Sequence, residues 1–281
     1  MKSVKIIGVP EHFNLPWHLA IEEGAFAERG IDLQWEDIPE GTGKMCQLLE
    51  KGDTDLAIIL TEGIIKSISE GNPSKIIQEY IATPLLWGIH VGAQRSFKQL
   101  SELENTKAAV SRFGSGSHLM AYVNAKNNEW NLNDLAFEVI NNLDGAKQAL
   151  TDGTADYFMW EHYTTKPLVD EGVFRRLGDC PTPWPCFMLV GTDSFIQEQP
   201  NVINHILEII NLYTSEFKNI PSIDRTLANR YEQQLPDIQE WMTTTEWSQS
   251  QLRVKTLVKV QETLLDLNLI TNQLPSKDFL R

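Results

Sequence analysis

The first 82 residues alternate short apolar runs with segments whose apolar residues recur at helical spacing. Short apolar runs between turn residues predict strands, and a run that is apolar throughout suits a parallel sheet covered on both faces. Four strands are expected, with helices between them, at residues 4–9, 31–35, 55–60 and 76–82. This βαβαβαβ series predicts a parallel sheet with right-handed crossovers.

The middle of the chain repeats the pattern on a smaller scale. Strands are expected at residues 107–111, 137–140, 156–160, 173–177 and 187–190, with helices between them. The final third is predicted to be helical: an apolar stripe covers 202–217, Pro221 and Pro236 separate shorter helices, and residues 252–267 form a closing helix. No repeat at solenoid spacing is present.

An α/β segment, a second α/β segment and helices that return to the first predict a fold of class α/β with two lobes and two crossings. The crossings are placed near Trp87–Val91 and Cys186–Leu189. We therefore expect residues 1–88 and 189–281 to form lobe 1, with the C-terminal helices, and residues 89–188 to form lobe 2. The length of 281 residues agrees with about two domains.

The charge balance narrows the choice of partners. The chain has 24 Lys and Arg against 38 Asp and Glu, a net charge of −14. Nucleic-acid binding requires phosphate neutralisation by a basic surface, and an anionic membrane surface would repel an acidic chain. No apolar run approaches the about 20 residues that cross a bilayer. We expect no nucleic-acid partner, no membrane insertion and a monomer.

Catalytic and metal motifs are absent. Gly41-Thr42-Gly43-Lys44 lacks the spacing of a phosphate loop, and Gly114-Ser115-Gly116 lacks the third glycine of a dinucleotide fingerprint. The six histidines form no HExxH motif, and Cys180 and Cys186 are not at a zinc-like spacing. We therefore predict no catalytic residue, no metal and no cofactor.

Polar, aromatic and glycine-rich loops instead follow the predicted strands. Helix N-termini and small residues let an anionic ligand approach the backbone, arginine can pair with an anion, and tryptophan supplies a flat apolar wall. The candidate ligand-binding residues are His12, Asn14, Trp17, Gly41, Thr42, Thr61, Glu62, Arg112, Ser115, Gly116, Ser117, His118, Trp160 and Glu161. Each also has a structural interpretation, as a helix cap, a core side chain or an ion pair.

Several segments resemble the type II periplasmic-binding-protein-like family, and most closely its nitrate, sulfonate, taurine and thiamine-precursor substrate-binding members. In the first lobe they are the "G-x-F…G-I-D-L" pattern at residues 24–33 and "G-D-x-D-L-A" at residues 52–57. In the second lobe it is RFGSGSHLMAY at residues 112–122. The resemblance covers most of the chain and is weakest after Pro221.

The resemblance implies a Venus-flytrap protein that closes on a small organic ligand, anionic or heteroaromatic, as the solute receptor of an ABC-type importer. It implies a hinge beside Pro84 to Trp87, and we expect Trp87, Gly88 and Phe187 to be the hinge residues. An ABC permease would then be a partner. Members that make a thiamine pyrimidine carry a cysteine cluster on one loop, which this chain lacks, so that synthase activity is disfavoured.

Two alternatives remain open. One is an enzyme on the same fold, related to thiamine-pyrimidine biosynthesis, with His12, His118 or Glu161 as acid or base. The other is a cytosolic sensor, which agrees with the N-terminus: MKSVKIIGVP shows no signal peptide, and three cysteines suit a reducing compartment. A cytoplasmic location is expected, or a periplasmic one if a signal peptide was trimmed.

Overall fold

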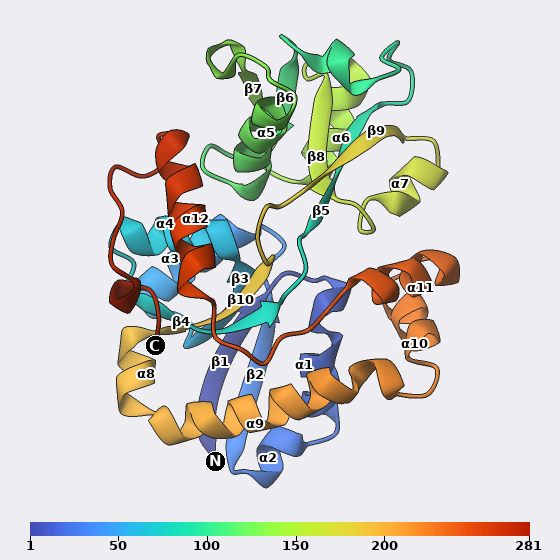
Figure 1. Cartoon of the computed structure of the whole chain (residues 1–281). Coiled ribbons are helices and arrows are strands. Elements are labelled where there is room, and N and C mark those ends of the chain that lie inside the picture. Colours follow the sequence, from blue (N-terminus) through green and yellow to red (C-terminus); the bar gives the residue numbers. More distant parts are fainter. The chain divides into compact units, whose positions relative to one another are not determined.

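The computed structural model describes all 281 residues, and the chain divides into two compact units (Figure 1). Unit 1 comprises Met1–Thr83 and Trp184–Arg281, and unit 2 comprises Pro84–Pro183. Each unit contains one five-stranded sheet. The chain therefore passes between the units after Thr83 and after Pro183, slightly earlier than the sequence-based boundaries at 88 and 188.

The sheet of unit 1 has the strand order β2-β1-β3-β10-β4. Its strands are β1 (Lys2–Gly8), β2 (Ile31–Asp37), β3 (Leu56–Leu60), β4 (Ser74–Ile81) and β10 (Phe187–Thr192). Strand β1 pairs in parallel with β2 and β3, whereas β10 is antiparallel to both β3 and β4. The four strands expected in this sheet therefore point in the same direction, but β10 lies antiparallel between β3 and β4, which the sequence did not predict. Every residue of β10 is buried, which suits its interior position between β3 and β4.

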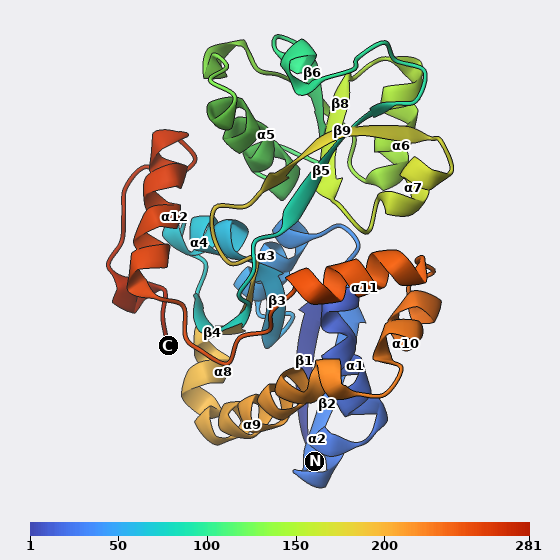
Figure 2. The same ribbon diagram turned by 45° about the vertical axis from the view of Figure 1, so that its right-hand side comes forward.

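Helices cover the sheet of unit 1. The first part of the unit contributes α1 (Leu15–Glu22), α2 (Ala25–Glu28), α3 (Thr42–Lys51), α4 (Thr61–Ser69) and the 3-10 turn η1 (His12–Asn14). The C-terminal part contributes α8 (Asp193–Glu198), α9 (Pro200–Glu216), α10 (Ile223–Arg230), α11 (Leu235–Thr244) and α12 (Val254–Asp266). Helix α9 packs on α1 and α2, and α12 packs on α4, as Figure 2 also shows. The C-terminal helices thus belong to unit 1.

The sheet of unit 2 has the strand order β7-β6-β8-β5-β9. Its strands are β5 (Leu86–Gly92), β6 (Lys107–Val110), β7 (Ala136–Val139), β8 (Tyr157–Glu161) and β9 (Phe174–Pro181). Its helices are α5 (Gly116–Asn127), α6 (Leu143–Asp152) and α7 (Lys166–Asp170), with 3-10 turns η2 (Leu100–Leu103) and η3 (Leu132–Asp134). Strand β6 is parallel to β7 and β8, and β5 is antiparallel to β8 and β9.

Both sheets share one topological feature. In unit 1 the chain runs from β1 out to β2 and then back past β1 to β3, and in unit 2 it runs from β6 to β7 and back past β6 to β8. Right-handed crossovers place the helices of these two steps on opposite faces of the sheet. The strand order therefore reverses between β1 and β3, and between β6 and β8. Ligands of open α/β sheets bind beyond the carboxyl ends of the strands at this reversal.

Candidate functional site

In unit 1, the loop that follows β1 carries a buried asparagine. A Cβ atom on Gly8, the last residue of β1, would lie 2.6 Å from the Trp35 ring and 3.1 Å from Asn14 Nδ2, so this position favours glycine. Asn14 is 1% exposed, and its Nδ2 donates to the Val9 carbonyl at 2.8 Å. Its Oδ1 is buried and has no hydrogen-bond partner. An acceptor therefore remains unused at the end of β1.

His12 and Trp17, from the same loop and helix α1, lie in the aromatic core of unit 1. The His12 ring is centred 4.2 Å from Trp241 and 4.9 Å from Phe13, and burial lowers the pKa of His12 to about 3, so the ring is neutral. Trp17 is fully buried and stacks on Phe26. Both rings pack in the core, and His12 Nε2 and Trp17 Nε1 are buried without a hydrogen-bond partner, so ligand contact by these residues stays a prediction.

Helices α3 and α4 start side by side. Gly41, with φ of 75°, precedes α3, and neither helix has a side-chain cap. A Cβ atom on Gly63, in the first turn of α4, would lie 2.2 Å from the Thr42 methyl carbon. The absence of a side chain at Gly63 therefore lets the first turns of α3 and α4 approach each other. The backbone amides of these turns have no side-chain cap and carry a partial positive charge, and they lie at the ends of β2 and β3.

Thr61, the first residue of α4, is a structural anchor. Its backbone N–H donates to the Cys186 carbonyl at 3.0 Å, and its Oγ1 donates to the Pro185 carbonyl at 2.5 Å and to that of Cys186 at 3.2 Å. The side chain is fully buried. Thr61 therefore fixes the start of α4 against the segment that leads into β10, and its hydroxyl hydrogen is already used within unit 1.

Glu62, the next residue, is the most unusual side chain at this end of the sheet. It is 2% exposed, and its Oε2 accepts a hydrogen bond from the indole Nε1–H of Trp184 at 2.8 Å. Its Oε1 is buried without a partner. Burial raises the pKa of Glu62, and the bond from Trp184 opposes that shift only in part. Trp184 is thus the donor that orients the Glu62 carboxyl group.

In unit 2, three serines at the start of α5 form a hydroxyl cluster. Ser117 Oγ accepts from the Ser111 backbone N–H at 3.0 Å, and Ser115 Oγ caps the helix by accepting from His118 N–H at 3.3 Å. The hydroxyl oxygen of Ser117 also lies 3.1 Å from that of Ser115 and 3.4 Å from that of Ser111. The structure therefore brings together Ser115 and Ser117, two of the predicted ligand residues, with Ser111 as a further member of the cluster.

His118 closes this turn. Its Nδ1 accepts a hydrogen bond from Gly114 N–H at 3.0 Å, and burial lowers the pKa of His118. A neutral ring with Nδ1 as acceptor carries its hydrogen on Nε2, so that atom is a donor. Phe137 and Tyr122 contact the ring edge-on at centroid distances of 4.7 and 5.2 Å. Arg112, in the same loop, is half-buried.

Glu161 and Trp160 end strand β8, the other strand at the reversal in unit 2. Glu161 is 3% exposed, and its Oε2 accepts from Thr164 N–H at 2.6 Å, which closes the turn after β8. Burial raises the pKa of Glu161. Trp160 stacks on Phe158 at 5.5 Å. Glu161 is a predicted ligand-binding residue, and the backbone N–H of Thr164 already occupies its Oε2 atom.

The three expected hinge residues lie inside strands. Trp87 pairs with Glu161 and Cys180, and Gly88 pairs with Trp160 and Asp179, all within the sheet of unit 2. Phe187 pairs with Leu60 and Ile81 within the sheet of unit 1. The chain passes between the units at 83–84 and 183–184, a few residues before each of these three positions.

The sequence did not predict a polar network around β5 of unit 2, the strand that lies between β8 and β9. His90 is fully buried, its pKa is lowered to about 3 by burial, and its Nε2 lies 2.9 Å from Thr165 Oγ1. Nearby, His162 Nδ1 lies 2.7 Å from Asp179 Oδ1, and the Arg176 guanidinium contacts the same His162 ring. These residues come from distant segments, so no spacing in the sequence signals the network.

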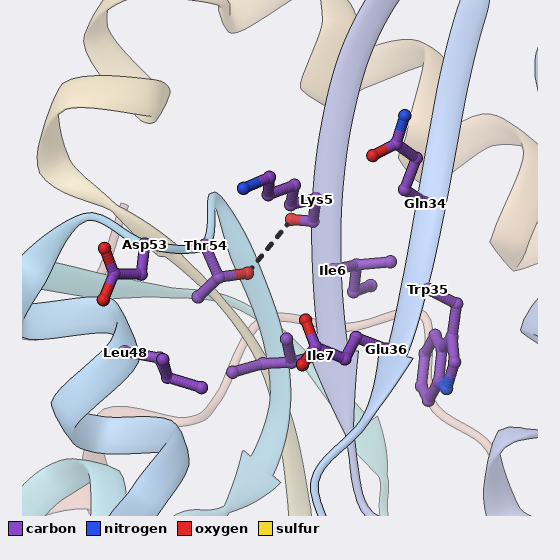
Figure 3. A pocket seen from close by; sticks show the side chains of 9 residues that line it. All are labelled: Lys5, Ile6, Ile7, Gln34, Trp35, Glu36, Leu48, Asp53 and Thr54. Carbon is purple, nitrogen blue, oxygen red and sulfur yellow. Dashed lines mark hydrogen bonds between the residues drawn. The ribbon is translucent and has the colours of Figure 1, made fainter.

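A separate pocket of about 320 Å³ lies between β1, β2 and α3 of unit 1 (Figure 3). Its lining combines the charged residues Lys5, Glu36 and Asp53 with apolar residues such as Ile7 and Leu48. None of the predicted ligand residues lines it. Nowhere in the chain do three or more His, Cys, Asp or Glu side chains form a group that could hold a metal ion. No helix is both long and apolar enough to cross a membrane.

Comparison with known proteins agrees with this architecture. The model of the Ca3427-like PBP family matches residues 87–180, most of unit 2. The Candida albicans CA3427 gene product, described as having the generic periplasmic-binding-protein fold, is 23% identical, with a TM-score of 0.90 over 100% of this chain and 96% of that one. No curated protein matches the sequence.

Two sulfonate-binding proteins have the same architecture. The alkanesulfonate-binding protein SsuA from Xanthomonas axonopodis pv. citri, bound to MOPS, is 14% identical with a TM-score of 0.79, covering 96% of this chain and 94% of that one. The aliphatic sulphonate-binding protein SsuA from Escherichia coli is 13% identical with a TM-score of 0.74, covering 100% and 92%. The expected fold is confirmed: the chain has the two-lobed, type II periplasmic-binding-protein-like fold.

Proposed function

We propose that this protein binds a small organic acid without chemical turnover, and that it serves as the solute receptor of an ABC-type importer. Solved proteins of the same fold that bind sulfonates support the ligand class, and an ABC-type import component from Staphylococcus aureus, 12% identical with a TM-score of 0.79, supports the role in transport. The acidic group of the ligand is held at the start of α5, in unit 2.

The hydroxyl cluster at α5 carries this proposal. The cluster has three hydroxyl hydrogens, one each on Ser111, Ser115 and Ser117. The two contacts between hydroxyl oxygens use only two of these hydrogens as donors. One O–H donor therefore remains, and His118 Nε2–H is a second. Donors at a helix N-terminus, beyond the end of a strand at a topological reversal, suit a carboxylate or sulfonate.

The residues that the sequence offered as acid or base support binding without turnover. His12 is packed in the core of unit 1 as a neutral ring. His118 Nδ1 accepts from Gly114, and Glu161 Oε2 accepts from Thr164. A general acid or base must be within hydrogen-bond reach of the proton that it moves. His12 and Glu161 instead contact their own units, and His118, whose Nδ1 is held by Gly114, is left with Nε2–H as a hydrogen-bond donor to the acidic group.

Calorimetry on ligand-stripped protein tests the binding function. Ethanesulfonate, propionate and an aminomethylpyrimidine are titrated into wild type, Ser111→Ala and the control Ser101→Ala, which changes an exposed serine in η2. Wild type and the control are expected to bind an acid equally, and Ser111→Ala about ten-fold more weakly, because a hydrogen bond to a charged group is worth about 1.5–3 kcal/mol. Absence of acid binding by wild type would refute the proposal.

The transport role has a separate test. Fractionation of cells that express the native gene is expected to recover the protein in the periplasmic or external fraction, together with its permease after cross-linking. Exclusive recovery in the cytoplasm would contradict the importer role and would leave ligand binding intact.

A further inference from the structure

Another pocket, of about 360 Å³, lies in unit 1 beside the edge strand β4. It forms where the segment before α12 pairs with β4: Glu79 N–H donates to the Ser250 carbonyl, and Ser248 N–H donates to the Tyr80 carbonyl, both at 2.9 Å. The start of α12 also lines it. Every lining residue belongs to unit 1, so the pocket is separate from the acid site proposed in unit 2.

The donors in this pocket are not used within the protein. The Arg253 guanidinium makes no ion pair or hydrogen bond, and the hydroxyl groups of Ser250 and Thr256 donate to no atom of the chain. An arginine side chain carries five N–H donors, and a hydroxyl group both donates and accepts. A ligand in this pocket would therefore meet several donors without breaking a contact of the fold.

The pocket also contains acceptors. Gln251 Nε2 donates to the Arg281 carbonyl at 2.9 Å, which fixes the amide and leaves its Oε1 as an acceptor. The Glu79 carboxyl group is half-buried. Burial raises the pKa of Glu79, and the Ser248 hydroxyl and the Arg253 charge oppose that shift in part. Acceptors and donors thus face the same space.

The charges and the shape of the lining narrow the class of ligand. Glu79 and Arg253 have opposite charges, so an anion would meet the Glu79 carboxylate and a cation would meet the Arg253 guanidinium. The lining contains no aromatic ring, and its apolar residues are only Ala82 and Pro185. An aromatic ligand would therefore find no flat wall, and a fatty chain would find little apolar surface.

We propose that this pocket binds a neutral, hydroxyl-rich small molecule, a sugar or a polyol, as a second ligand of the protein. One hydroxyl group of such a ligand donates to the Glu79 carboxylate while its neighbour accepts from the Arg253 guanidinium. The hydroxyl groups of Ser250 and Thr256 then bond to further ligand oxygens. The pocket volume falls within the range of about 300–1,000 Å³ that is usual for small-molecule sites.

Binding is tested first with three neutral probes: glucose, myo-inositol and sorbitol. Each is titrated with wild-type protein, and saturation-transfer NMR measures the bound fraction. At least one probe is expected to bind with a saturable curve. Absence of saturable binding by all three would overturn the inference and would leave the proposed acid binding untouched, because that binding is measured with other compounds in unit 2.

Arg253→Ala and Glu79→Ala assign the bound probe to this pocket. Each variant is expected to bind it about ten-fold more weakly, because each removes hydrogen bonds to a charged group. The matched controls Arg225→Ala and Glu198→Ala change exposed residues of α10 and α8 and are expected to keep the wild-type affinity. Arg253 is exposed, so its replacement tests the site even if Glu79→Ala is unstable. Equal affinity of wild type and Arg253→Ala would overturn the inference.

Competition tests the argument from charge. Propionate, ethylammonium and glycine are added in excess to protein that is saturated with the neutral probe. None of them is expected to displace it, because an ion or a small zwitterion does not replace the bonds to the hydroxyl groups of the pocket. Displacement by any of the three would assign the pocket to charged ligands and would overturn the inference.

Discussion

Thr42 and Gly63 pack so closely that a Cβ atom on Gly63 would lie 2.2 Å from the Thr42 methyl carbon. This contact joins the first turns of α3 and α4, the two helices that begin at the ends of β2 and β3. It sets how near the uncapped amides of these helices lie to Glu62, the residue that precedes Gly63. The distance between the first turns of α3 and α4 thus depends on the absence of a side chain at Gly63.

Gly63→Ala is therefore expected to destabilise the protein by about 1–3 kcal/mol, although alanine is the better helix former. Thr42→Ser removes the methyl group concerned. In that background the same Gly63→Ala change is expected to be neutral or stabilising, since the next Thr42 atom is 3.4 Å away. Urea unfolding of the four proteins measures the coupling, and additive effects would contradict the contact.

Two of the three buried serines of the hydroxyl cluster, Ser111 and Ser117, are expected to differ in their effect on stability. Ser117 Oγ accepts the backbone N–H of Ser111, which Ser117→Ala would leave buried and unsatisfied. Ser111 Oγ accepts no backbone N–H. Ser117→Ala is therefore expected to lower the free energy of unfolding by about 1–2 kcal/mol and Ser111→Ala by clearly less. Denaturant titration compares the two, and equal losses would argue against this arrangement.

Most strands were predictable because each is a short apolar run between turn residues, as at residues 55–60. The serine-glycine turn before α5 was predictable for a related reason, because its spacing and its place after a strand are both local features. Strand partners were not predictable in the same way. Strand β10 reads as a buried strand, but only the tertiary structure shows that it separates β3 from β4.

The hydrogen-bond partners of the two buried glutamates, Glu62 and Glu161, also could not be predicted from the sequence. Glu62 and Glu161 both lie at the end of an apolar strand, and the sequence predicted both as ligand-binding residues. The difference lies in their partners: the turn after β8 supplies Thr164 N–H to Glu161, whereas Glu62 meets Trp184, a residue 122 positions away. Long-range pairing of this kind leaves no periodic signal.

The stability of the protein is expected to fall in acid partly through His12. Its pKa is lowered to about 3 by burial, from 6.5, so the unfolded chain binds a proton that the folded protein excludes. Stability from this residue is present above pH 6.5 and is lost by about 1.4 kcal/mol per unit as the pH falls toward 3. His12→Leu is expected to reduce this slope in urea unfolding between pH 4 and 7. An unchanged slope would refute the assignment.

Glu62 is expected to act in the opposite direction. Burial raises its pKa above the ordinary 4.5, so between the unfolded and folded values the native protein holds more protons than the unfolded chain. Stability from the neutral carboxyl is therefore complete below pH 4.5 and is lost as the pH rises through the folded value. Relative to Glu62→Gln, wild type is expected to become progressively less stable from pH 4 to pH 8 in ligand-free urea unfolding. Stability curves of the two proteins that run parallel across this range would contradict a raised pKa for Glu62 in the folded protein.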